Sequence, residues 1–459
     1  MMNYKGQRVL VLGLGLTGLS LALWLKNRGA AVTVADTRAA PPMLATLRKR
    51  VPDVTVRLGE WDKALFEQVD LVAISPGINV NTPMVAAARA RHVPFVGDIE
   101  VFARELPAAQ RVIAITGSNG KSTVTALTGA MCAAAGLRTV VAGNIGVPVL
   151  DALRVAEQAG RHPDVYVLEL SSFQLETTTS LAPTVAAVLN LSPNHLDWHP
   201  NVDDYVRAKS RIFQNGGQQV LNRDDPLTMA MQSETAVRTF GGGAPVGDRQ
   251  WGLRERAGGE WLAHGSIDLV PASALALTGR HNALNALAAL ALANAMGLAE
   301  EVVMRPLCEF RGLAHRMSLV AEVRGVAYVD DSKSTTVAST IAALEGMRRK
   351  SVLIAGGDAK GQDFMALVPA VRSHARAVVL LGRDAPLLER ALRAAGVDLV
   401  SATGIEDAVA LATDLAHPGD AVLLSPACAS WDMFRDYAER GDRFASAVRT
   451  LPLEAKSDA

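Results

Sequence analysis

Two glycine-rich loops constrain the fold of this chain most strongly, because each follows a short apolar strand and precedes a helical stretch. The first loop lies in "VLVLGLGLTGLS", from Val9 to Ser20, and the second in "ITGSNGKST", from Ile115 to Thr123. A strand that turns on glycines into a helix N-terminus is a building unit of open parallel sheets, and it presents backbone N–H groups to phosphate. We therefore expect an α/β protein with two phosphate-binding loops.

Short aliphatic strands alternate with helical segments over three successive stretches of the 459-residue chain. Because these strands lack a polar and apolar alternation, they indicate parallel sheets that are covered on both faces. Glycine-rich and polar segments interrupt the pattern around residues 240–275, and we interpret them as a small antiparallel addition of hairpins. We expect a helix over about residues 282–296 to close this domain. We predict three α/β domains, over residues 1–97, 98–311 and 312–459.

Composition argues against several classes of function. Lysine plus arginine and aspartate plus glutamate both number 46, so a nucleic-acid binder that relies on bulk positive charge is disfavoured. Cys132, Cys308 and Cys428 are far apart and lack metal-binding spacing, which fits buried residues in a reducing compartment. The N-terminus shows no apolar signal core, and the alanine-leucine stretch over 283–295 is too short to span a bilayer. We expect a soluble cytoplasmic protein.

The second loop favours ATP chemistry. It lies between the apolar strand Val112–Ile115 and a helical stretch from Thr123. In a phosphate-binding loop, backbone N–H groups face the phosphates, Lys121 reaches the terminal ones and the Ser122 hydroxyl can bind Mg²⁺. Ile115 stands where the usual pattern has its first glycine. The strand–loop–helix context nevertheless makes a chance glycine turn the poorer interpretation.

Three side chains further along are candidates for a metal-assisted site. Glu169 ends the buried strand "VYVLEL", where a carboxylate is costly unless it is paired or metal-bound. His195 follows another strand, but a lone loop histidine is more often structural, as we expect for His199. Lys209 in "YVRAKSRIF" has, by itself, the character of a surface lysine on a helix. The residues alone therefore indicate Glu169 and leave His195 and Lys209 undecided.

Over nearly its whole length the chain resembles the Mur ligases, the ATP-dependent amide-forming enzymes of peptidoglycan synthesis. The motifs that carry the resemblance are, in order, "TGSNGKST", "GNIG", "ELSSFQLE", "NHLDWH", "GRHNALNALAA", "GLAHR", "DDSKSTT", "GGDAKGQDF" and "LLSPACASWDMF". Within the family, the chain is most similar to the branch that adds D-glutamate, through "GLGLTGLS", "DTRAAPP", "SPGI" and "RGDRF".

The resemblance implies a ligase that joins D-glutamate to UDP-N-acetylmuramoyl-L-alanine. The substrate carboxylate would attack the γ-phosphate of ATP, giving an acyl phosphate and ADP, and the amine of D-glutamate would then displace phosphate. The resemblance also implies two Mg²⁺ ions, a monomer, and Rossmann-like outer domains on either side of a central P-loop ATPase-like domain. We expect the C-terminal domain to close during the cycle by a hinge near Arg311 and Gly312.

The family pattern assigns residues to the ATP and metal sites. Lys121, Glu169, His195 and Lys209 match catalytic positions. Lys209 matches a lysine that is carbamylated in this family, which would make it an anionic ligand for Mg²⁺ as well. Ser122 and Glu169 match ligands of the first Mg²⁺, and His195 matches a ligand of the second. The positions that match ATP contacts are Gly117, Ser118, Asn119, Gly120, Lys121, Ser122, Thr123, Asn282, Asn285, Arg316 and Asp331.

The first glycine loop matches the binding site for the UDP-linked substrate. The positions for this substrate are Gly15, Leu16, Thr17, Asp36, Thr37, Arg38, Ser75, Pro76, Gly77 and Asn144. The positions for D-glutamate are Thr335, Lys360, Ser430 and Tyr437, with Lys333 and Asp358 as helpers. A cation and hydroxyl donors suit a glutamate carboxylate.

Three residues depart from the family pattern. Asn194 stands where aspartate is usual, which removes a negative charge beside His195. Thr336 replaces a frequent asparagine, and Tyr437 replaces a common phenylalanine and adds a hydroxyl.

Other functions remain as alternatives. The nearest alternative is a sister ligase that adds another amino acid, or a folylpolyglutamate synthetase. The absence of a "DNPR" stretch disfavours the diamino-acid enzyme, and "SPACASWDMF" favours the D-glutamate branch. A nicotinamide dehydrogenase would bind its cofactor at the first loop. Asp36, about twenty residues after the glycines, is a residue type at a spacing that is typical of such enzymes. A regulatory nucleotide-binding module would keep the second loop but would not need Glu169, His195 and Lys209.

Overall fold

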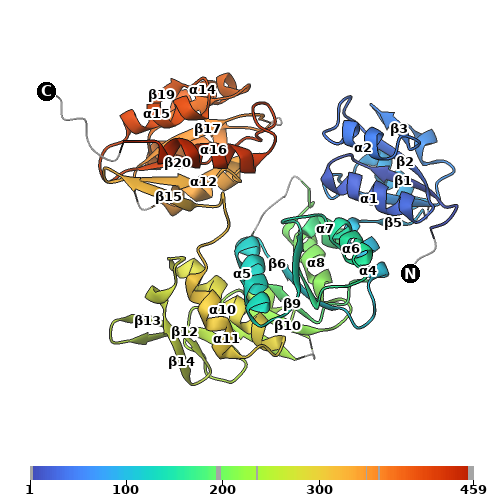
Figure 1. Ribbon diagram of the computed structural model, residues 1–459, viewed down its shortest axis with the longest axis horizontal. Helices are drawn as coiled ribbons and strands as arrows, with labels where there is room; N and C mark the ends of the chain where they lie inside the picture. The colour runs from blue at the N-terminus through green and yellow to red at the C-terminus, as the bar shows by residue number, and fades with distance from the viewer. Residues whose placement is uncertain are drawn as a thin grey trace. The chain divides into compact units, whose positions relative to one another are not determined.

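The computed structural model forms two compact units, Met1–Phe310 and Arg311–Ala459. The first unit contains two β-sheets and the second contains one, each combined with helices (Figure 1). This arrangement of three α/β sheets confirms the predicted fold class. The structure describes residues 4–91, 93–192, 198–233, 236–347, 349–359 and 362–452.

The N-terminal sheet is parallel, with the strand order β3-β2-β1-β4-β5. The chain moves outward from β1 to β3 and then returns to the other side of β1 with β4. The strand order therefore reverses between β1 and β4, which is where open α/β sheets bind ligands. The strands are β1 (Arg8–Leu12), β2 (Ala31–Asp36), β3 (Thr55–Leu58), β4 (Leu71–Ile74) and β5 (Phe95–Val96), with helices α1 (Leu16–Asn27), α2 (Leu44–Arg50) and α3 (Pro83–Ala90).

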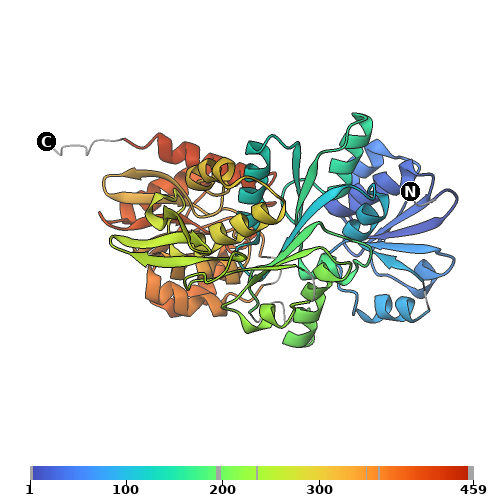
Figure 2. The same cartoon turned by 90° about the horizontal axis from the view of Figure 1, so that it is seen from below.

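The central sheet has nine strands in the order β14-β13-β12-β11-β10-β9-β6-β8-β7. It is parallel from β7 to β12, and β12, β13 and β14 pair antiparallel. The predicted antiparallel addition is therefore confirmed, and Figure 2 shows it in yellow-green. The strands are β6 (Arg111–Thr116), β7 (Thr139–Gly143), β8 (Val165–Glu169), β9 (Val185–Val188), β10 (Gln218–Asn222), β11 (Val237–Phe240), β12 (Gln250–Arg256), β13 (Gly259–His264) and β14 (Ile267–Pro271).

The helix that was predicted over residues 282–296 is α10 (Arg280–Ala295), which packs against α5. Its alanine and leucine residues are buried on nearly all sides in the core of the central sheet, and a helix that is apolar all round is a buried one. The other helices of this region are α4 (Asp98–Glu105), α5 (Lys121–Ala134), α6 (Val149–Gln158), α7 (Ser172–Glu176), α8 (Val202–Ser210), α9 (Pro226–Met229) and α11 (Glu300–Glu309).

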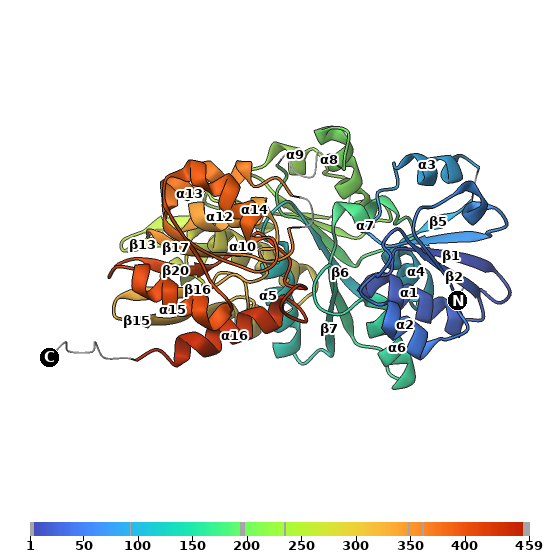
Figure 3. The same cartoon turned by 90° about the horizontal axis from the view of Figure 1, so that it is seen from above.

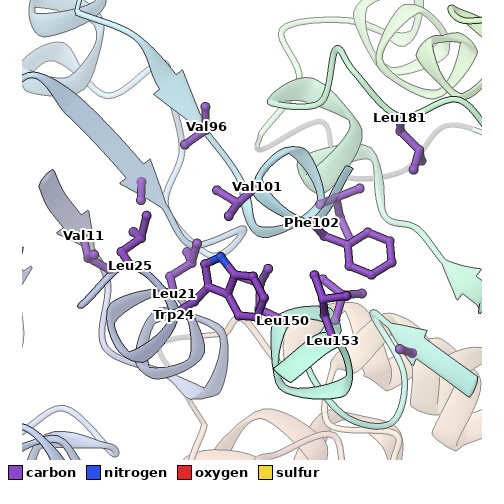
Figure 4. Packing of buried hydrophobic residues seen from close by; sticks show 14 of the residues in the cluster. Val11, Leu21, Trp24, Leu25, Val96, Val101, Phe102, Leu150, Leu153 and Leu181 are labelled. Carbon is purple, nitrogen blue, oxygen red and sulfur yellow. The ribbon is translucent and has the colours of Figure 1, made fainter. Parts of the chain in front are cut away.

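A shared hydrophobic core joins the N-terminal and central sheets. Trp24 of α1, Phe102 of α4 and Leu153 of α6 belong to one buried cluster, which Figure 4 shows from close by. At its edge, the Arg28 guanidinium lies over the Trp24 ring and forms an ion pair of 2.6 Å with Glu157 of α6. This continuous packing explains why the two sheets form one unit.

The C-terminal sheet has the order β15-β16-β20-β17-β18-β19, and only the pair β15 and β16 is antiparallel. Helices α12 to α14 pack on one face, and α15 and α16 pack on the other (Figure 3). The elements are β15 (Ser318–Val323), β16 (Val326–Asp330), β17 (Ser351–Gly356), β18 (Ala375–Leu381), β19 (Asp398–Ser401), β20 (Ala421–Leu424), α12 (Val337–Gly346), α13 (Val368–His374), α14 (Ala385–Leu392), α15 (Ile405–Leu415) and α16 (Tyr437–Arg449).

Within the part of the chain that the structure describes, no helix combines the length and the apolar character needed to cross a membrane.

Candidate functional site

The second glycine loop connects β6 to α5, and its backbone conformation depends on two glycines. Gly117 and Gly120 have φ angles of 153° and 81°, which side chains of L-residues rarely adopt. A Cβ atom on Gly117 would lie 3.0 Å from the Cβ of Leu189, and one on Gly120 would lie 2.3 Å from Oδ1 of Asn285. The loop therefore requires glycine at both positions, and Asn285 lies against it.

Polar groups from the segment after the neighbouring strand β9 and from α8 hold the loop in place. The Asn119 N–H donates to Oδ1 of Asn190 at 2.8 Å, and Nδ2 of Asn190 donates to the Asn119 carbonyl at 3.2 Å. The Ser118 hydroxyl is 2.9 Å from the Tyr205 hydroxyl and accepts from the Ser192 N–H. We did not predict Asn190 or Tyr205. The available signal for Asn190 was its position directly after a buried strand at the same sheet edge.

Lys121 begins α5 and folds back over the loop. Its ammonium donates to the carbonyl oxygens of Gly117 and Ser118, at 2.9 Å each. Ser122, the next residue, is buried in the first turn of the helix. The lysine is thus placed where phosphate oxygens would meet it, and a bound phosphate would compete with the two carbonyls for its protons.

Two asparagines on the first turns of α10 face the same region. Nδ2 of Asn285 donates to Oδ1 of Asn282 at 3.2 Å, and Asn282 in turn donates to the Thr278 carbonyl. The structure therefore brings the predicted ATP residues of the central sheet together around one loop.

Glu169 ends β8, between β6 and β7 in the sheet. Its side chain is almost fully buried, since the residue is 1% exposed. Oε1 accepts from Nδ2 of Asn144 at 2.7 Å, whereas Oε2 has no hydrogen-bond partner among the described residues. A buried carboxylate oxygen without a partner is costly in an empty protein interior, and a cation or donor from a ligand would remove that cost.

Lys209 is not on the surface, where its helical context alone would have placed it. It is 2% exposed, and its Nζ donates to Oγ1 of Thr116 at 3.0 Å and to the Gly117 carbonyl at 2.9 Å. Burial lowers the pKa of this amine well below its usual range, and the nearby Lys121 charge lowers it further, against the opposing effect of Glu169. Burial and the Lys121 charge therefore both favour the neutral amine over the ammonium at this position beside the phosphate loop.

The predicted metal site is described only in part. His195 and the neighbouring Asn194 lie outside the described residues. In the ranges that the structure does describe, no group of three or more His, Cys, Asp or Glu side chains could hold a metal. His199 is buried with its Nε2 3.0 Å from the Ser172 hydroxyl, which fits a structural role.

The first glycine loop borders a pocket of about 380 Å³ at the reversal point of the N-terminal sheet. Ten residues were predicted to bind the UDP-linked substrate. One of them, Asn144 in the central domain, does not line this pocket, and its side-chain amide donates a hydrogen bond to Glu169. The other nine line it together: Gly15, Leu16, Thr17, Asp36, Thr37, Arg38, Ser75, Pro76 and Gly77.

Asp36 has both carboxylate oxygens occupied by protein donors. Oδ1 accepts from the backbone N–H and Nε of Arg38, and Oδ2 accepts from the Leu14 N–H and from Nη2 of Arg38, all within 2.9 Å. A carboxylate has about four acceptor positions. The role that this aspartate has in nicotinamide enzymes, acceptance from ribose hydroxyls, would require the Arg38 guanidinium to move away.

In the C-terminal unit, Asp331 follows β16 and lies deep in the protein. Its carboxylate accepts from the Ser425 hydroxyl at 2.9 Å and from the Met317 N–H at 3.2 Å. Burial raises the pKa of Asp331 to about 6, although the Ser334 and Ser425 hydroxyls and the Arg316 charge act to lower it. Arg316 and Asp331, both predicted to contact ATP, are therefore close enough to interact.

Of the residues predicted for D-glutamate, Thr335 lies in the loop after β16 and Ser430 in the loop after β20. Lys360 lies outside the described residues. Tyr437 begins α16, with Nζ of Lys333 5.0 Å from its ring centroid. Ser430 is buried, and the Thr335 carbonyl accepts a bond of 3.4 Å from Gln362.

Arg440 is a buried cation at this edge of the sheet that we did not predict. Its guanidinium donates to the hydroxyl and carbonyl of Ser332, at 3.0 and 2.8 Å, and to the Cys428 carbonyl at 3.2 Å. Burial lowers the pKa of Arg440 to about 10. The motif "RGDRF" contains this arginine, but nothing in its local pattern indicates burial.

Thr336, one of the departures from the family pattern, has a clear structural role. It is the N-cap of α12, and its hydroxyl oxygen accepts from the Ser339 N–H in a capping box. Asparagine and threonine are both good N-cap residues, so this substitution preserves the start of the helix.

The chain matches known proteins over all three sheets. Residues 7–97 match the family description "Mur ligase MurD-like, N-terminal domain", residues 115–293 match "Mur ligase middle domain", and residues 315–428 match "Mur ligase, glutamate ligase domain". The solved structure of UDP-N-acetylmuramate-alanine ligase from Thermotoga maritima has the same fold, with a TM-score of 0.59 at 19% identity over 96% of this chain and 99% of that one.

Two curated relatives have the name UDP-N-acetylmuramoylalanine–D-glutamate ligase. The relative from Methylobacillus flagellatus is 52% identical, with 98% of each chain covered. The relative from Thiobacillus denitrificans is 53% identical, with 99% of each chain covered. Because the family descriptions match most of the chain and these relatives match nearly all of it, the chain belongs to the Mur ligase family.

Proposed function

We propose that this chain is an ATP-dependent ligase that joins D-glutamate to UDP-N-acetylmuramoyl-L-alanine in peptidoglycan precursor synthesis. The observation that carries the proposal is the cluster at the second glycine loop. There the loop backbone and Lys121 lie beside a buried Lys209 and, at the end of the adjacent strand, a buried Glu169 with one carboxylate oxygen unpartnered among the described residues. The relatives of that name, at about half identity over the full length, support the choice of substrates.

The reaction has two bond-forming steps. An oxygen of the substrate carboxylate attacks the γ-phosphorus of ATP, so that ADP leaves and an acyl phosphate forms. The amine of D-glutamate then attacks the acyl carbon, phosphate leaves with the bonding electrons, and the amine gives up a proton. Catalysis of such transfers rests on positioning and on charge stabilisation.

Lys121 and the loop N–H groups are proposed to hold the transferring phosphoryl group. The ammonium already faces two carbonyl oxygens and would exchange these partners for phosphate oxygens. Such an exchange replaces neutral acceptors by anionic ones, which strengthens each hydrogen bond.

Ser122 and Glu169 are the described residues that fit a Mg²⁺ ion, because Mg²⁺ prefers oxygen ligands and Oε2 of Glu169 lacks a hydrogen-bond partner in the described part of the chain. When bound, Mg²⁺ would neutralise the charge that accumulates between the phosphates and the substrate carboxylate. By family resemblance His195 is proposed for a second ion.

Lys209 is proposed to be carbamylated. A neutral amine forms a C–N bond to the carbon of CO₂ and loses a proton, which leaves an anionic carbamate. The buried position and lowered pKa of Lys209 supply the neutral amine that this step needs. The product would place a negative charge near Lys121, where the neutral amine has none.

The N-terminal pocket is proposed to bind the UDP group of the substrate. The glycine loop offers N–H groups at the start of α1, and Arg38 is held by Asp36 at the border of the pocket. Because both substrates and ATP are cytoplasmic metabolites, we also propose a cytoplasmic location. In the C-terminal unit, Thr335, Lys360, Ser430 and Tyr437 are proposed for D-glutamate.

The test is phosphate release with Mg²⁺-ATP, UDP-N-acetylmuramoyl-L-alanine and one amino acid at a time. We expect release with D-glutamate and none with L-glutamate. Phosphate release with L-alanine or a diamino acid, each offered with its own nucleotide precursor, would show that the chain is a different ligase of the same family. No release with any combination would contradict the proposal, and nicotinamide binding at the first loop would be measured next. Glu169→Ala should abolish release and serves as the control for contaminating ATPases.

A further inference from the structure

Two buried carboxylates of helix α4 differ in their hydrogen bonds and in the direction of their pKa shifts. Glu100 accepts from the backbone N–H and the hydroxyl of both Thr179 and Ser180, at 2.6 to 3.0 Å, and from Nε of Arg104. Although burial opposes it, these donors lower the pKa of Glu100 to about 2. Glu100 is therefore a fully satisfied anion that anchors the loop after α7.

Asp98, at the first position of the same helix, is equally buried but poorly satisfied. Its Oδ2 accepts from Nε2 of Gln174 at 3.3 Å, and its Oδ1 has no hydrogen-bond partner among the described residues. Burial raises the pKa of Asp98 to about 6, although the Gln174 side chain and the Ile99 N–H act to lower it. A buried carboxylate with an oxygen that lacks a hydrogen-bond partner is energetically costly.

Gln174 connects Asp98 to the segment that carries Glu169. Oε1 of Gln174 accepts from the backbone N–H and from the hydroxyl of Ser171. The backbone N–H of Gln174 donates to the Ser171 hydroxyl, and all three bonds measure 3.1 to 3.2 Å. The Ser171 N–H can only donate, so the amide oxygen of Gln174 must face it and the amide NH₂ must face Asp98. Ser171 in turn follows Glu169 by two residues and starts α7.

We propose that Asp98 is a positioning residue that, through Gln174 and Ser171, fixes the end of β8 so that Glu169 is held in place for the metal-bound phosphates. This inference rests on the proposed function, and it adds a residue on the far side of α7 to the machinery of the site. Without the Asp98 acceptor, the Gln174 NH₂ would be left buried and unpartnered. Its amide would then reorient, and the start of α7 would lose its fixed acceptor.

The experiment compares Asp98→Ala and Asp98→Asn with the wild-type chain. Asparagine keeps an acceptor for Gln174 and removes the charge, whereas alanine removes the acceptor. Mn²⁺ binding in the presence of a non-hydrolysable ATP analogue is measured by electron paramagnetic resonance, together with kcat, KM and thermal unfolding. Loss of an outer partner of a metal ligand typically costs about 10- to 100-fold in metal affinity or activity, so we expect about a tenfold weaker Mn²⁺ affinity and lower kcat for Asp98→Ala. We expect Asp98→Asn to resemble the wild type.

Two further variants keep the test decisive. Glu100→Gln, on the same helix, should lower the unfolding temperature and leave Mn²⁺ affinity unchanged. Gln174→Met should weaken Mn²⁺ binding as Asp98→Ala does, and the double variant should be no worse than either single one. Wild-type Mn²⁺ affinity in Asp98→Ala, an Asp98→Asn as impaired as Asp98→Ala, or an equal loss in Glu100→Gln would each overturn the inference. If the wild type binds Mn²⁺ with nucleotide but releases no phosphate with D-glutamate, only the proposed function fails.

Discussion

The two glycine-rich loops have similar sequences and similar positions, each at the start of a helix after a buried strand, but they differ in what occupies them. The first borders an open pocket, and Leu16 at its tip is 64% exposed. The second is filled by the chain's own groups, because Lys121 caps its carbonyls and Asn285 lies against Gly120. If, as we propose, the first loop only binds substrate, it can border an open pocket before the substrate is bound. The second loop, which is proposed to act in phosphoryl transfer, already holds the Lys121 ammonium in position before ATP binds.

The charges of the two regions differ in the same way. At the first loop, the cation Arg38 is paired with Asp36 in a two-pronged ion pair. At the second, Lys121 and Lys209 both donate to the Gly117 carbonyl, and burial and mutual repulsion lower the pKa of Lys209. The comparison predicts that changes at the second loop lower kcat or the affinity for ATP, while changes at the first loop raise the KM of the UDP-linked substrate.

The largest expected effect is that of Lys121→Ala. Removal of a preorganised donor to developing charge typically costs about 10²- to 10³-fold in kcat. We expect a kcat loss of this size, measured by phosphate release, with little change in the affinity of the UDP-linked substrate. A variant with normal kcat and a raised KM for ATP alone would show that Lys121 only binds.

Arg38→Ala should affect the pocket at the first loop and leave the second loop unchanged. The change removes a charged donor from the pocket and leaves Asp36 buried without its main partner. Hydrogen bonds to charged groups contribute about 1.5–3 kcal/mol, so we expect at least a tenfold higher KM for the UDP-linked substrate. The KM of ATP should be unchanged. A fall in kcat as large as that of Lys121→Ala would break the distinction between the loops.

Asn190→Ala should have a smaller effect, because it removes two neutral hydrogen bonds that hold the second loop. At about 0.5–1.5 kcal/mol for each bond, we expect the affinity for ATP to fall about fivefold. Isothermal titration with a non-hydrolysable ATP analogue measures this directly. Unchanged ATP affinity in Asn190→Ala would show that these two bonds do not hold the loop in its binding conformation.

The smallest effect is expected for Leu16→Ala. The leucine side chain is largely exposed, and the contribution of this position to diphosphate binding would come from its backbone N–H at the start of α1. KM and kcat should both stay near the wild-type values. A marked rise in the KM of the UDP-linked substrate would show that the exposed leucine packs on the bound nucleotide.

Much of the fold was predictable because buried parallel strands are continuous apolar runs. The predicted central helix and the antiparallel addition were both found, as α10 and β12 to β14. The strands β10, β11, β15 and β19 were missed. β15 and β19 lie at the edges of the C-terminal sheet and are half exposed. β10 (QQVLN) and β11 (VRTF) lie inside the central sheet but carry polar residues among their few apolar ones, so none of the four has the apolar run on which the prediction depended.

The same distinction applies to the candidate site: residues in local motifs could be predicted, and residues that are placed by packing could not. The phosphate loop could be recognised because its glycines and Lys121 are local features of the sequence. The burial of Lys209 could not, because it depends on how α8 packs near the end of β6. Asn190 belongs to the site only because β9 pairs with β6 in the sheet. The pairing of Asn144 with Glu169 likewise follows from the register of β7 and β8.

The core built around Trp24 has a consequence for inhibitor design. Because it joins the N-terminal and central sheets into one unit, we expect the pocket proposed for the UDP group and the phosphate loop to keep a fixed separation. A tether gives the greatest gain in avidity when its length matches the span between two sites. A uridine diphosphate mimic and an ATP mimic, each weak alone, could therefore be connected by a short rigid linker of a single optimal length.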